Sequence, residues 1–416
     1  MRVMLAMLGA RRRYLLPELL LELGVLVCFV TDLYAGKHGW MQTAIGWIGR
    51  RLHLTGLRSI AGRASTRIPP ARVVAFQWLG LRYAIAARFV SPGDVRLFAS
   101  VNRSFCHKAV PYLRGVDVCW AYNGAALQLF EAARTRNIRC VLEQVIAPRR
   151  DERRELGEAE KDWPAWSTAK YTLPPAADPL AQREEAEWRL ADMIVAGSRY
   201  VADCLRSAGI APGRCTIVPS AIDLERFDLG REMQRGGPLR VLFVGQINLR
   251  KGVPYLLDAV RRLNSGQIEL KLVGALQIPR ERVSEFSRWA TLLGPVPLSD
   301  IVSHYHWADI VVVPSVCEGS AMVTYEARGC GVPIIATPNA GAFFSPGTDG
   351  LEIPVRDADA IAGTLERLAR HPDEVRHLRE GAIANRHLLG RDVYRERISK
   401  VLDAVAHMSG AEPAYA

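Results

Sequence analysis

The stretch that decides the fold reads Ile310-Val-Val-Val-Pro-Ser-Val-Cys-Glu-Gly-Ser-Ala-Met-Val-Thr-Tyr-Glu326. Residues 310–313 are uninterruptedly apolar, which is typical of a strand buried on both faces of a parallel sheet. Residues 323–329 are expected to be helical, so Glu318 follows the carboxyl end of a strand, where doubly wound sheets bind ligands. Solvated helix faces carry similar carboxylate pairs, so Glu318 and Glu326 alone do not define a site.

Strands and helices alternate outward from this stretch in both directions. The second half predicts strands over residues 239–244, 268–273, 290–294, 310–313 and 332–336, and helices over 253–263 and 298–307. The first half predicts strands over residues 3–8, 25–30, 95–99, 116–120, 140–143 and 193–196. This rhythm indicates right-handed βαβ units in two α/β domains, and 416 residues suit two such cores. We place them at residues 1–228 and 239–390, separated by a linker rich in glycine. Residues 149–179 are expected to be a surface excursion of the first domain.

Three loops are predicted to meet at one edge of the second sheet. Residues 245–252 follow its first strand and contain Arg250 and Lys251, whose charges suit phosphate oxygens without a metal. The backbone amides of Gly319, Ser320, Ala321, Met322 and Val323 open a helix, and helix starts favour anions. Gly341 follows the last strand, where glycine lets backbone approach a phosphate. Glu318 and Glu326 are eight residues apart, which corresponds to ~12 Å of rise along a helix. That distance is about the reach from a sugar across a diphosphate to a ribose.

From residue 193 to about 368 the chain resembles the retaining glycosyltransferases of family four, the glycosyl transferases group 1. The matching motifs are Ala191–Ser198, Val218–Asp223 with Phe227, Val244-Gly245 with Lys251-Gly252, Tyr305, Ala308-Asp309, Pro314-Ser315, Glu318, Glu326-Ala327, Gly331–Ala336 and Gly350-Leu351. The resemblance implies the GT-B fold, two Rossmann-like doubly wound domains that face each other across a cleft. It also implies that a C-terminal helix, about residues 392–407, crosses back to the first domain.

The resemblance assigns roles to residues of the second domain. Lys251, aided by Arg250, would grip the donor diphosphate in the loop that contains Gly245 and Gln246. Glu318 would bind the transferred sugar near its reacting carbon, and Glu326 would bind the ribose. Ser198 lies where the family approaches the nucleotide from the interdomain side. The co-substrate would be a nucleotide-diphosphate sugar, with no metal and no cofactor.

Two departures from the family pattern affect these assignments. Gln246 replaces an arginine that is usual after the glycine of the phosphate loop, and Arg250 could supply the missing charge. The family often has a histidine that faces the sugar after a central strand of the first domain, and none is present here. Glu143 or Gln144 is the candidate substitute; otherwise the leaving phosphate takes the acceptor proton. Ala321 stands where glycine is common, a small change.

Positive charge gathers in the first hundred residues, which hold 14 Lys and Arg against four Asp and Glu, within a net charge of +11. Gly9, Arg11, Arg12 and Arg13 follow the first strand, so these arginines could face a phosphate or only water. Residues 40–88 interleave arginines with tryptophan and leucine. That pattern suits an anionic membrane surface, or equally a helix pair with a solvated arginine face. No recognised module supports binding to nucleic acid.

Other features argue against a metal site and a membrane span. The eight cysteines are scattered without a Cys-x-x-Cys pair, which fits reduced thiols in the cytoplasm. Asp357-Ala358-Asp359 resembles a metal-binding DxD motif, but its place before an apolar run favours a helix N-cap. Residues 14–30 are apolar but contain two glutamates, and we expect a helix and a buried strand there. Residue 1 leads directly into a strand, with no signal peptide.

These observations predict a cytoplasmic enzyme, at the inner face of the membrane if residues 40–88 bind lipid. It would transfer a hexose with retention to a glycan or a lipid-linked acceptor in a surface polysaccharide or glycolipid pathway. Two alternatives remain. Gln246 and the absent histidine would also fit a non-catalytic sugar-nucleotide-binding scaffold, and the same fold supports nucleotide-sugar epimerases. Base, sugar, linkage and oligomeric state do not follow from the sequence.

Overall fold

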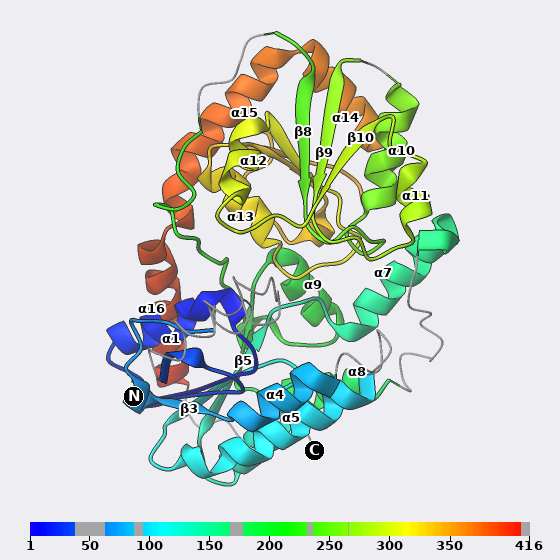
Figure 1. Cartoon of the computed structure of the whole chain (residues 1–416). Coiled ribbons are helices and arrows are strands. Elements are labelled where there is room, and N and C mark those ends of the chain that lie inside the picture. The colour runs from blue at the N-terminus through cyan, green and yellow to red at the C-terminus, as the bar shows by residue number, and fades with distance from the viewer. Residues whose placement is uncertain (38–62, 87–94, 167–177, 231–235, 265, 409–416) are drawn as a thin grey trace.

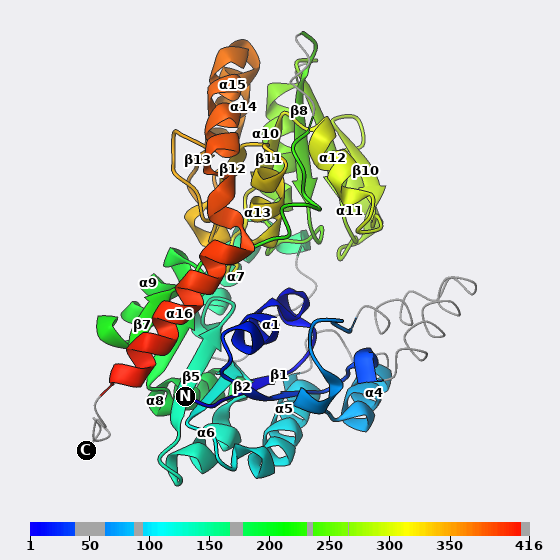
Figure 2. The same ribbon diagram turned by 90° about the vertical axis from the view of Figure 1, so that its left-hand side faces the viewer.

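Two parallel sheets, each in its own α/β domain, make up the computed structural model of the chain (Figures 1 and 2). It describes residues 1–37, 63–86, 95–166, 178–230, 236–264 and 266–408. The first sheet has the order β3-β2-β1-β4-β5-β6-β7 and the second β10-β9-β8-β11-β12-β13. Both repeat the doubly wound order, in which the first strand lies centrally and the chain reverses direction beside it.

The first domain contains the strands β1 (Val3–Met7), β2 (Leu26–Thr31), β3 (Val73–Ala75), β4 (Val118–Tyr122), β5 (Arg139–Gln144), β6 (Met193–Ala196) and β7 (Cys215–Ile217). Its helices are α1 (Leu15–Glu22), α4 (Gln77–Ala86), α5 (Val95–Ala109), α6 (Leu127–Arg134), α7 (Arg149–Asp162), α8 (Pro179–Leu190) and α9 (Arg199–Ser207). α1 and β2 confirm the helix and buried strand expected over residues 14–30. None of the helices in the described ranges is both long and apolar enough to cross a membrane.

The second domain contains the strands β8 (Leu239–Val244), β9 (Ile268–Val273), β10 (Ala290–Gly294), β11 (Ile310–Val313), β12 (Ile334–Ala336) and β13 (Gly350–Glu352). Its helices are α10 (Val253–Leu263), α11 (Arg280–Ser284), α12 (Ile301–Trp307), α13 (Met322–Gly329), α14 (Ala358–Arg370) and α15 (Pro372–Ala384). The last helix of the chain, α16 (Arg391–His407), continues downward from α15 to the first domain (Figure 2).

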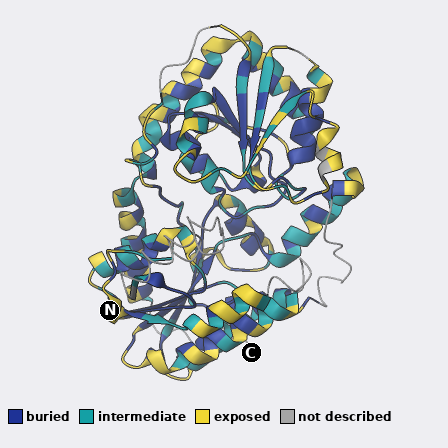
Figure 3. Cartoon of the chain, in the orientation of Figure 1, coloured by how far each residue is buried: buried dark blue, intermediate teal, exposed yellow. Residues whose placement is uncertain are grey.

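The uninterrupted apolar runs arise because both faces of the central strands are covered, as Figure 3 shows. In β11, Ile310 and Val312 belong to the core on one face, whereas Val311 and Val313 belong to the core on the other. Val311 pairs with Leu242 of β8 and with Ile334 of β12. The strand that decides the fold therefore lies in the middle of its sheet, and its carboxyl end opens toward the first domain.

One predicted strand is wrong, and three short strands were missed. Residues 95–99 lie in α5, where the buried residues Val101, Phe105 and Ala109 recur every fourth position as in a helix. The apolar start of that helix resembles a strand when it is taken alone. β3, β7 and β13 have three residues each, which is too short for a recognisable alternation.

The segment after β5 is not a surface excursion of the first domain, contrary to expectation. α7 starts beside the first sheet and rises to the second domain (Figure 1). There Leu156 and Ala159, with Trp166 of the 3-10 turn Pro164–Trp166, are buried in the core beside Leu239 and Leu257. The expected segment ran from residue 149 to residue 179, and its residues 167–177 lie outside the described residues.

α16 links the domains a second time. Tyr394, Ile398, Val401 and Val405 are buried in the core that covers one face of the first sheet. At the start of the helix, Arg391 forms ion pairs with Glu18 at 2.9 Å and with Glu22 at 2.7 Å, both on α1. The described chain therefore ends on the domain where it began.

Replacing Trp166 tests whether α7 is part of the second core. Trp166 is 4% exposed and packs edge-to-face on Phe286, with 6.2 Å between ring centroids. We expect Trp166→Ala to lower the free energy of unfolding by about 3–5 kcal/mol, as measured by urea denaturation followed by circular dichroism. Trp78→Ala is the control, because Trp78 is 78% exposed, and should change stability by less than about 0.5 kcal/mol. Equal effects of the two changes would show that the 3-10 turn after α7 is not part of the second core.

Candidate functional site

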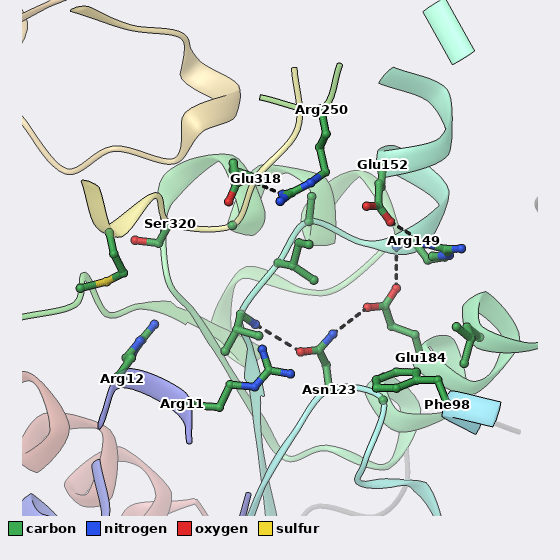
Figure 4. A pocket seen from close by; sticks show the side chains of 17 residues that line it. Arg11, Arg12, Phe98, Asn123, Arg149, Glu152, Glu184, Arg250, Glu318 and Ser320 are labelled. Atoms are coloured by element: carbon green, nitrogen blue, oxygen red, sulfur yellow. Dashed lines mark hydrogen bonds and ion pairs between the residues drawn. The ribbon is translucent and has the colours of Figure 1, made fainter. Parts of the chain in front are cut away.

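A pocket of about 480 Å³ lies where the carboxyl ends of the two sheets face each other. Figure 4 shows the side chains that enter it from both domains. Second-domain residues Arg250, Glu318, Gly319, Ser320 and Met322 form one side. The other side is made by first-domain residues Arg11, Arg12, Phe98, Asn123, Gly124, Val145, Ile146, Ala147, Arg149, Glu152, Leu180 and Glu184.

The predicted phosphate-loop cations and the first glutamate of the pair are in direct contact. Lys251 Nζ lies 2.7 Å from Oε1 of Glu318, and the Arg250 guanidinium forms an ion pair with the same oxygen. Burial lowers the pKa of Lys251, and the neighbouring Glu318 charge opposes that shift. Two cations thus share one carboxylate oxygen beyond the carboxyl ends of the neighbouring strands β8 and β11.

Backbone packing brings these two loops together. A Cβ atom on Gly252 would lie 1.8 Å from the Pro314 carbonyl oxygen, so only glycine fits, and its φ is 69°. The Val316 amide donates to the Arg250 carbonyl oxygen at 2.9 Å. The side chain of Asn248 accepts a hydrogen bond from the Lys251 amide at 3.0 Å. The phosphate loop is therefore fixed on the end of β11. Gly245 adjoins Lys251, and Gln246 is exposed.

Gly319 is in close contact with the first domain. A Cβ atom on Gly319 would lie 1.8 Å from the carbonyl oxygen of Val145. The Ala147 amide donates to the Glu318 carbonyl oxygen at 3.2 Å. The Ser198 hydroxyl donates to the Gly319 carbonyl oxygen. Gly341, with φ 61°, packs on the same carbonyl, so the structure brings these three predicted residues together.

Glu326 lies apart from the pocket's lining residues. α13 begins at Met322, not at residue 319, because the Ala321 amide is bonded to the Ala340 carbonyl oxygen at 3.0 Å. Glu318 therefore precedes the helix. The separation of ~12 Å that a continuous helix would give between Glu318 and Glu326 does not apply. Tyr305 donates a hydrogen bond to Glu326 at 2.8 Å. Burial raises the pKa of Glu326, and the positive charges of Arg13 and Arg226 oppose this. Val323 does not line the pocket.

The arginine loop after β1 has an unusual backbone. Arg12, Arg13 and Tyr14 have φ values of 44°, 50° and 64°, the left-handed region that non-glycine residues seldom occupy. Arg12 holds the loop: its Nη1 donates to Glu143 at 3.0 Å and to the Tyr394 hydroxyl of α16 at 2.9 Å. Gly9 has φ 82°, and its amide donates to Asp32 at 2.9 Å. Arg11 and Arg12 line the pocket, whereas Arg13 lies toward Glu326.

Neither candidate for the missing histidine lines the pocket. Glu143 is fully buried and accepts hydrogen bonds from Arg12 and from Trp120 Nε1 at 3.2 Å. Gln144 is also fully buried, and its Nε2 donates to Glu184 at 2.7 Å. Adjacent residues of a strand point to opposite faces, and here each side chain points into a core and not along the strand. Both side chains instead hold residues that line the pocket: Glu143 bonds to Arg12, and Gln144 bonds to Glu184.

Sequence analysis missed the polar residues on the first-domain side. Asn123 directly follows β4, so its place at a strand's carboxyl end was a usable signal. Glu152 and Glu184 come from α7 and α8, which only the tertiary structure brings to the pocket. Asp357 caps α14 by accepting from the Ala360 amide at 2.8 Å, as predicted. Among the described residues, no three His, Cys, Asp or Glu side chains cluster as a metal site requires.

Replacing Gly319 tests the contact between the domains. We expect Gly319→Ala to push the domains apart, because its Cβ would overlap the Val145 carbonyl. The measurement is hydrogen–deuterium exchange, which should become faster at the Ala147 amide. Gly363→Ala is the control, because no atom lies within 4 Å of a Cβ there. Unchanged protection of Ala147 in Gly319→Ala would contradict the contact.

Known proteins match the chain in sequence and in fold. Residues 238–371 match the family of glycosyl transferases group 1. A D-inositol 3-phosphate glycosyltransferase of Geodermatophilus obscurus is 32% identical over 188 residues, 39% of this chain and 42% of that protein. The chain spans about half the length of the curated relatives it matches.

Solved structures match nearly the whole chain at low sequence identity. HepE of Anabaena, solved in complex with UDP, has a TM-score of 0.63 at 13% identity, covering 97% of this chain and 100% of its own. A sucrose-phosphate synthase of Thermosynechococcus elongatus has a TM-score of 0.67 at 17% identity, covering 98% and 100%. Residues 238–371 therefore match a domain of the glycosyl transferases group 1, and the two doubly wound domains together have the GT-B fold.

Proposed function

We propose that the chain transfers a sugar from a nucleotide-diphosphate sugar to a hydroxyl acceptor bound in the pocket between its domains. The observation that carries this proposal is the contact of Lys251 and Arg250 with one oxygen of Glu318, beside a pocket that both domains line. Two cations on a single carboxylate leave positive charge for an anionic ligand. A diphosphate matches that charge and the width of the site.

The donor would exchange partners with Glu318. Phosphate oxygens take over the hydrogen bonds of Lys251 and Arg250, which frees the Glu318 carboxylate for the hydroxyls of the transferred sugar. The Lys251 side chain is 11% exposed, so its charge acts on the phosphate with little screening by water. Glu326, near Arg13, is proposed to bind the ribose beyond the pocket, with the α13 amides of Met322 and Val323 nearby.

The reaction breaks the bond between the anomeric carbon and the diphosphate oxygen and forms a bond from that carbon to the acceptor oxygen. The acceptor proton passes to the departing diphosphate, whose negative charge Lys251 and Arg250 stabilise. Because Glu143 and Gln144 are buried and engaged with other side chains, we assign neither of them as the base. Attack from the face that the leaving group vacates gives retention of configuration. These steps use the chain's own residues and require no metal.

The donor base is the first feature to determine. HepE was solved with UDP, so UDP-sugars are the first candidates, followed by GDP- and ADP-sugars in a thermal-shift panel. We propose a cytoplasmic role in a surface polysaccharide or glycolipid pathway, with a glycan or lipid-linked acceptor. A non-catalytic scaffold would release no nucleoside diphosphate, and an epimerase would convert the donor without an acceptor.

Lys251→Ala should lower transfer and donor hydrolysis by about 10²- to 10³-fold, because it removes a charge opposite the leaving diphosphate. The measurement is nucleoside diphosphate release with and without acceptor, at an unchanged melting temperature. Lys161→Ala is the matched control, because that side chain is 70% exposed on α7. Unchanged turnover in Lys251→Ala would refute the role of this residue.

We also propose that the first domain binds an anionic membrane surface. Most of the basic stretch, residues 40–62 and 87–88, lies outside the described residues. Within the described part, Trp78, Leu81 and Ile85 of α4 are 78%, 38% and 50% exposed at helical spacing. An exposed apolar stripe beside basic residues is typical of interfacial helices.

The membrane proposal predicts that the protein co-sediments with phosphatidylglycerol vesicles at low salt and is released by salt, because the attraction is screened. Phosphatidylcholine vesicles are the control. Trp78→Ala should weaken the binding without changing donor hydrolysis. Failure to sediment with the anionic vesicles would remove this proposal and leave the enzymatic one intact.

A further inference from the structure

The first-domain side of the pocket differs in chemistry from the donor side. Asn123, Glu152, Glu184 and the Phe98 ring face this part (Figure 4). Two carboxylates, an amide and an aromatic ring are groups that recognise hydroxyls and ring carbons. The question is whether an acceptor bound here could carry a phosphate.

The helix starts on this side already hold carboxylates. Glu187 of α8 accepts hydrogen bonds from the amides of Gly124, Ala126 and Leu127 at 2.6, 2.9 and 3.1 Å, at the start of α6. Glu184, one turn earlier on α8, accepts the amide of Arg149 at 2.8 Å, at the start of α7. Helix starts of this kind bind phosphates in many α/β proteins. Here α8 fills both of them, so an added anion would meet negative charge.

The arginines that line the pocket are also engaged. Arg149 bonds to Glu152 at 2.8 Å and to Asp178 at 3.0 Å. Arg12 pairs with Glu143, and Arg250 pairs with Glu318. Arg11 is exposed, and the described residues show no ion pair for it. One exposed arginine opposite the carboxylates of α7 and α8 is a weak phosphate site, because solvent screens its charge.

Uncharged hydrogen-bonding groups remain available in this part of the pocket. Asn123 uses one amide hydrogen to bond Glu184 at 3.2 Å, which leaves its second hydrogen for a ligand. Behind Gly124, which has no side chain, lies Asn102. It is fully buried, and neither side-chain polar atom has a hydrogen-bond partner in the described chain. A ligand hydroxyl or water can both donate and accept, as such amides require.

We propose that the acceptor group bound here is an uncharged, hydroxyl-bearing ring such as a sugar residue, and that Glu184 of α8, which lines the pocket, excludes phosphate monoesters. This inference rests on the proposed function and names the substrate class of the same site. An acceptor carried on a lipid phosphate would keep that phosphate outside the pocket. Burial raises the pKa of Glu184 to about 7, so this carboxylate carries its full charge, and excludes a further anion most strongly, at pH values above 7.

The test compares matched acceptors with the full-length protein and the nucleotide sugar that the thermal-shift panel selects. Methyl glucoside, methyl galactoside, methyl mannoside and myo-inositol are each paired with the corresponding phosphate monoester. We expect kcat/KM to be higher for the neutral member by at least about tenfold, the effect of a like-charge contact. Donor hydrolysis without acceptor is measured in parallel, because it reports the proposed function independently of the acceptor.

Variants assign the preference to α8. Glu184→Gln should reduce the ratio between the kcat/KM values of neutral and phosphorylated acceptors by about tenfold. Glu185→Gln, one position along on an exposed part of the helix, is the matched control. Asn123→Ala should raise KM for the neutral acceptors by about fivefold, the effect of losing one hydrogen bond. This second variant tests the proposal if Glu184→Gln does not fold.

Three results would overturn the inference. If donor is hydrolysed and the phosphate monoesters are the better acceptors, the inference fails and the proposed function stands. If Glu184→Gln folds but leaves the ratio unchanged, α8 does not exclude phosphate. If neither hydrolysis nor transfer occurs with any donor in the panel, the proposed function fails and this inference fails with it.

Discussion

The contact of Gly319 with the Val145 carbonyl is the constraint on which the rest of the site depends. No side chain separates the two backbones there, so the carboxyl ends of β5 and β11 come within hydrogen-bonding distance across the domain boundary. Glu318, one residue earlier, is thereby placed against the first domain while its side chain reaches Lys251. The pocket exists because a larger residue at this point would keep the two sheets apart.

Charge is distributed differently on the two sides of that contact. On the proposed donor side, two cations share Glu318, and we propose that a diphosphate displaces this arrangement because it offers more negative charge than one carboxylate. On the acceptor side, buried carboxylates already occupy the helix starts. Breaking those contacts would leave backbone amides without partners in a buried place, which costs more than an exposed ion pair is worth. The same fold thus provides one exchangeable anion site and two closed ones.

The links between the domains limit how the pocket can change. Besides the connection near residue 230, Leu156 and Ala159 of α7 and Trp166 of the following 3-10 turn pack in the second core, and α16 packs on the first. Arg12 joins the left-handed arginine loop to Glu143 and to Tyr394 of α16. The strained backbone of the loop that lines the pocket is therefore held by contacts from β5 and α16.

The sequence by itself determined the two α/β domains, the central strands and the loops that carry Lys251, Arg250 and Glu318. Buried strands are continuous apolar runs, and the topology of parallel sheets places their following loops at one edge. The strand expected at residues 95–99 was wrong, because a short apolar run fits a helix as well as a strand. The surface position expected for α7 was wrong, because the sequence of a helix does not show which core it packs against. The burial of Glu143 and Gln144, and the presence of Glu184, Glu152 and Phe98 in the pocket, follow only from the tertiary structure. Those placements depend on which elements pack together, and packing joins residues far apart in the chain.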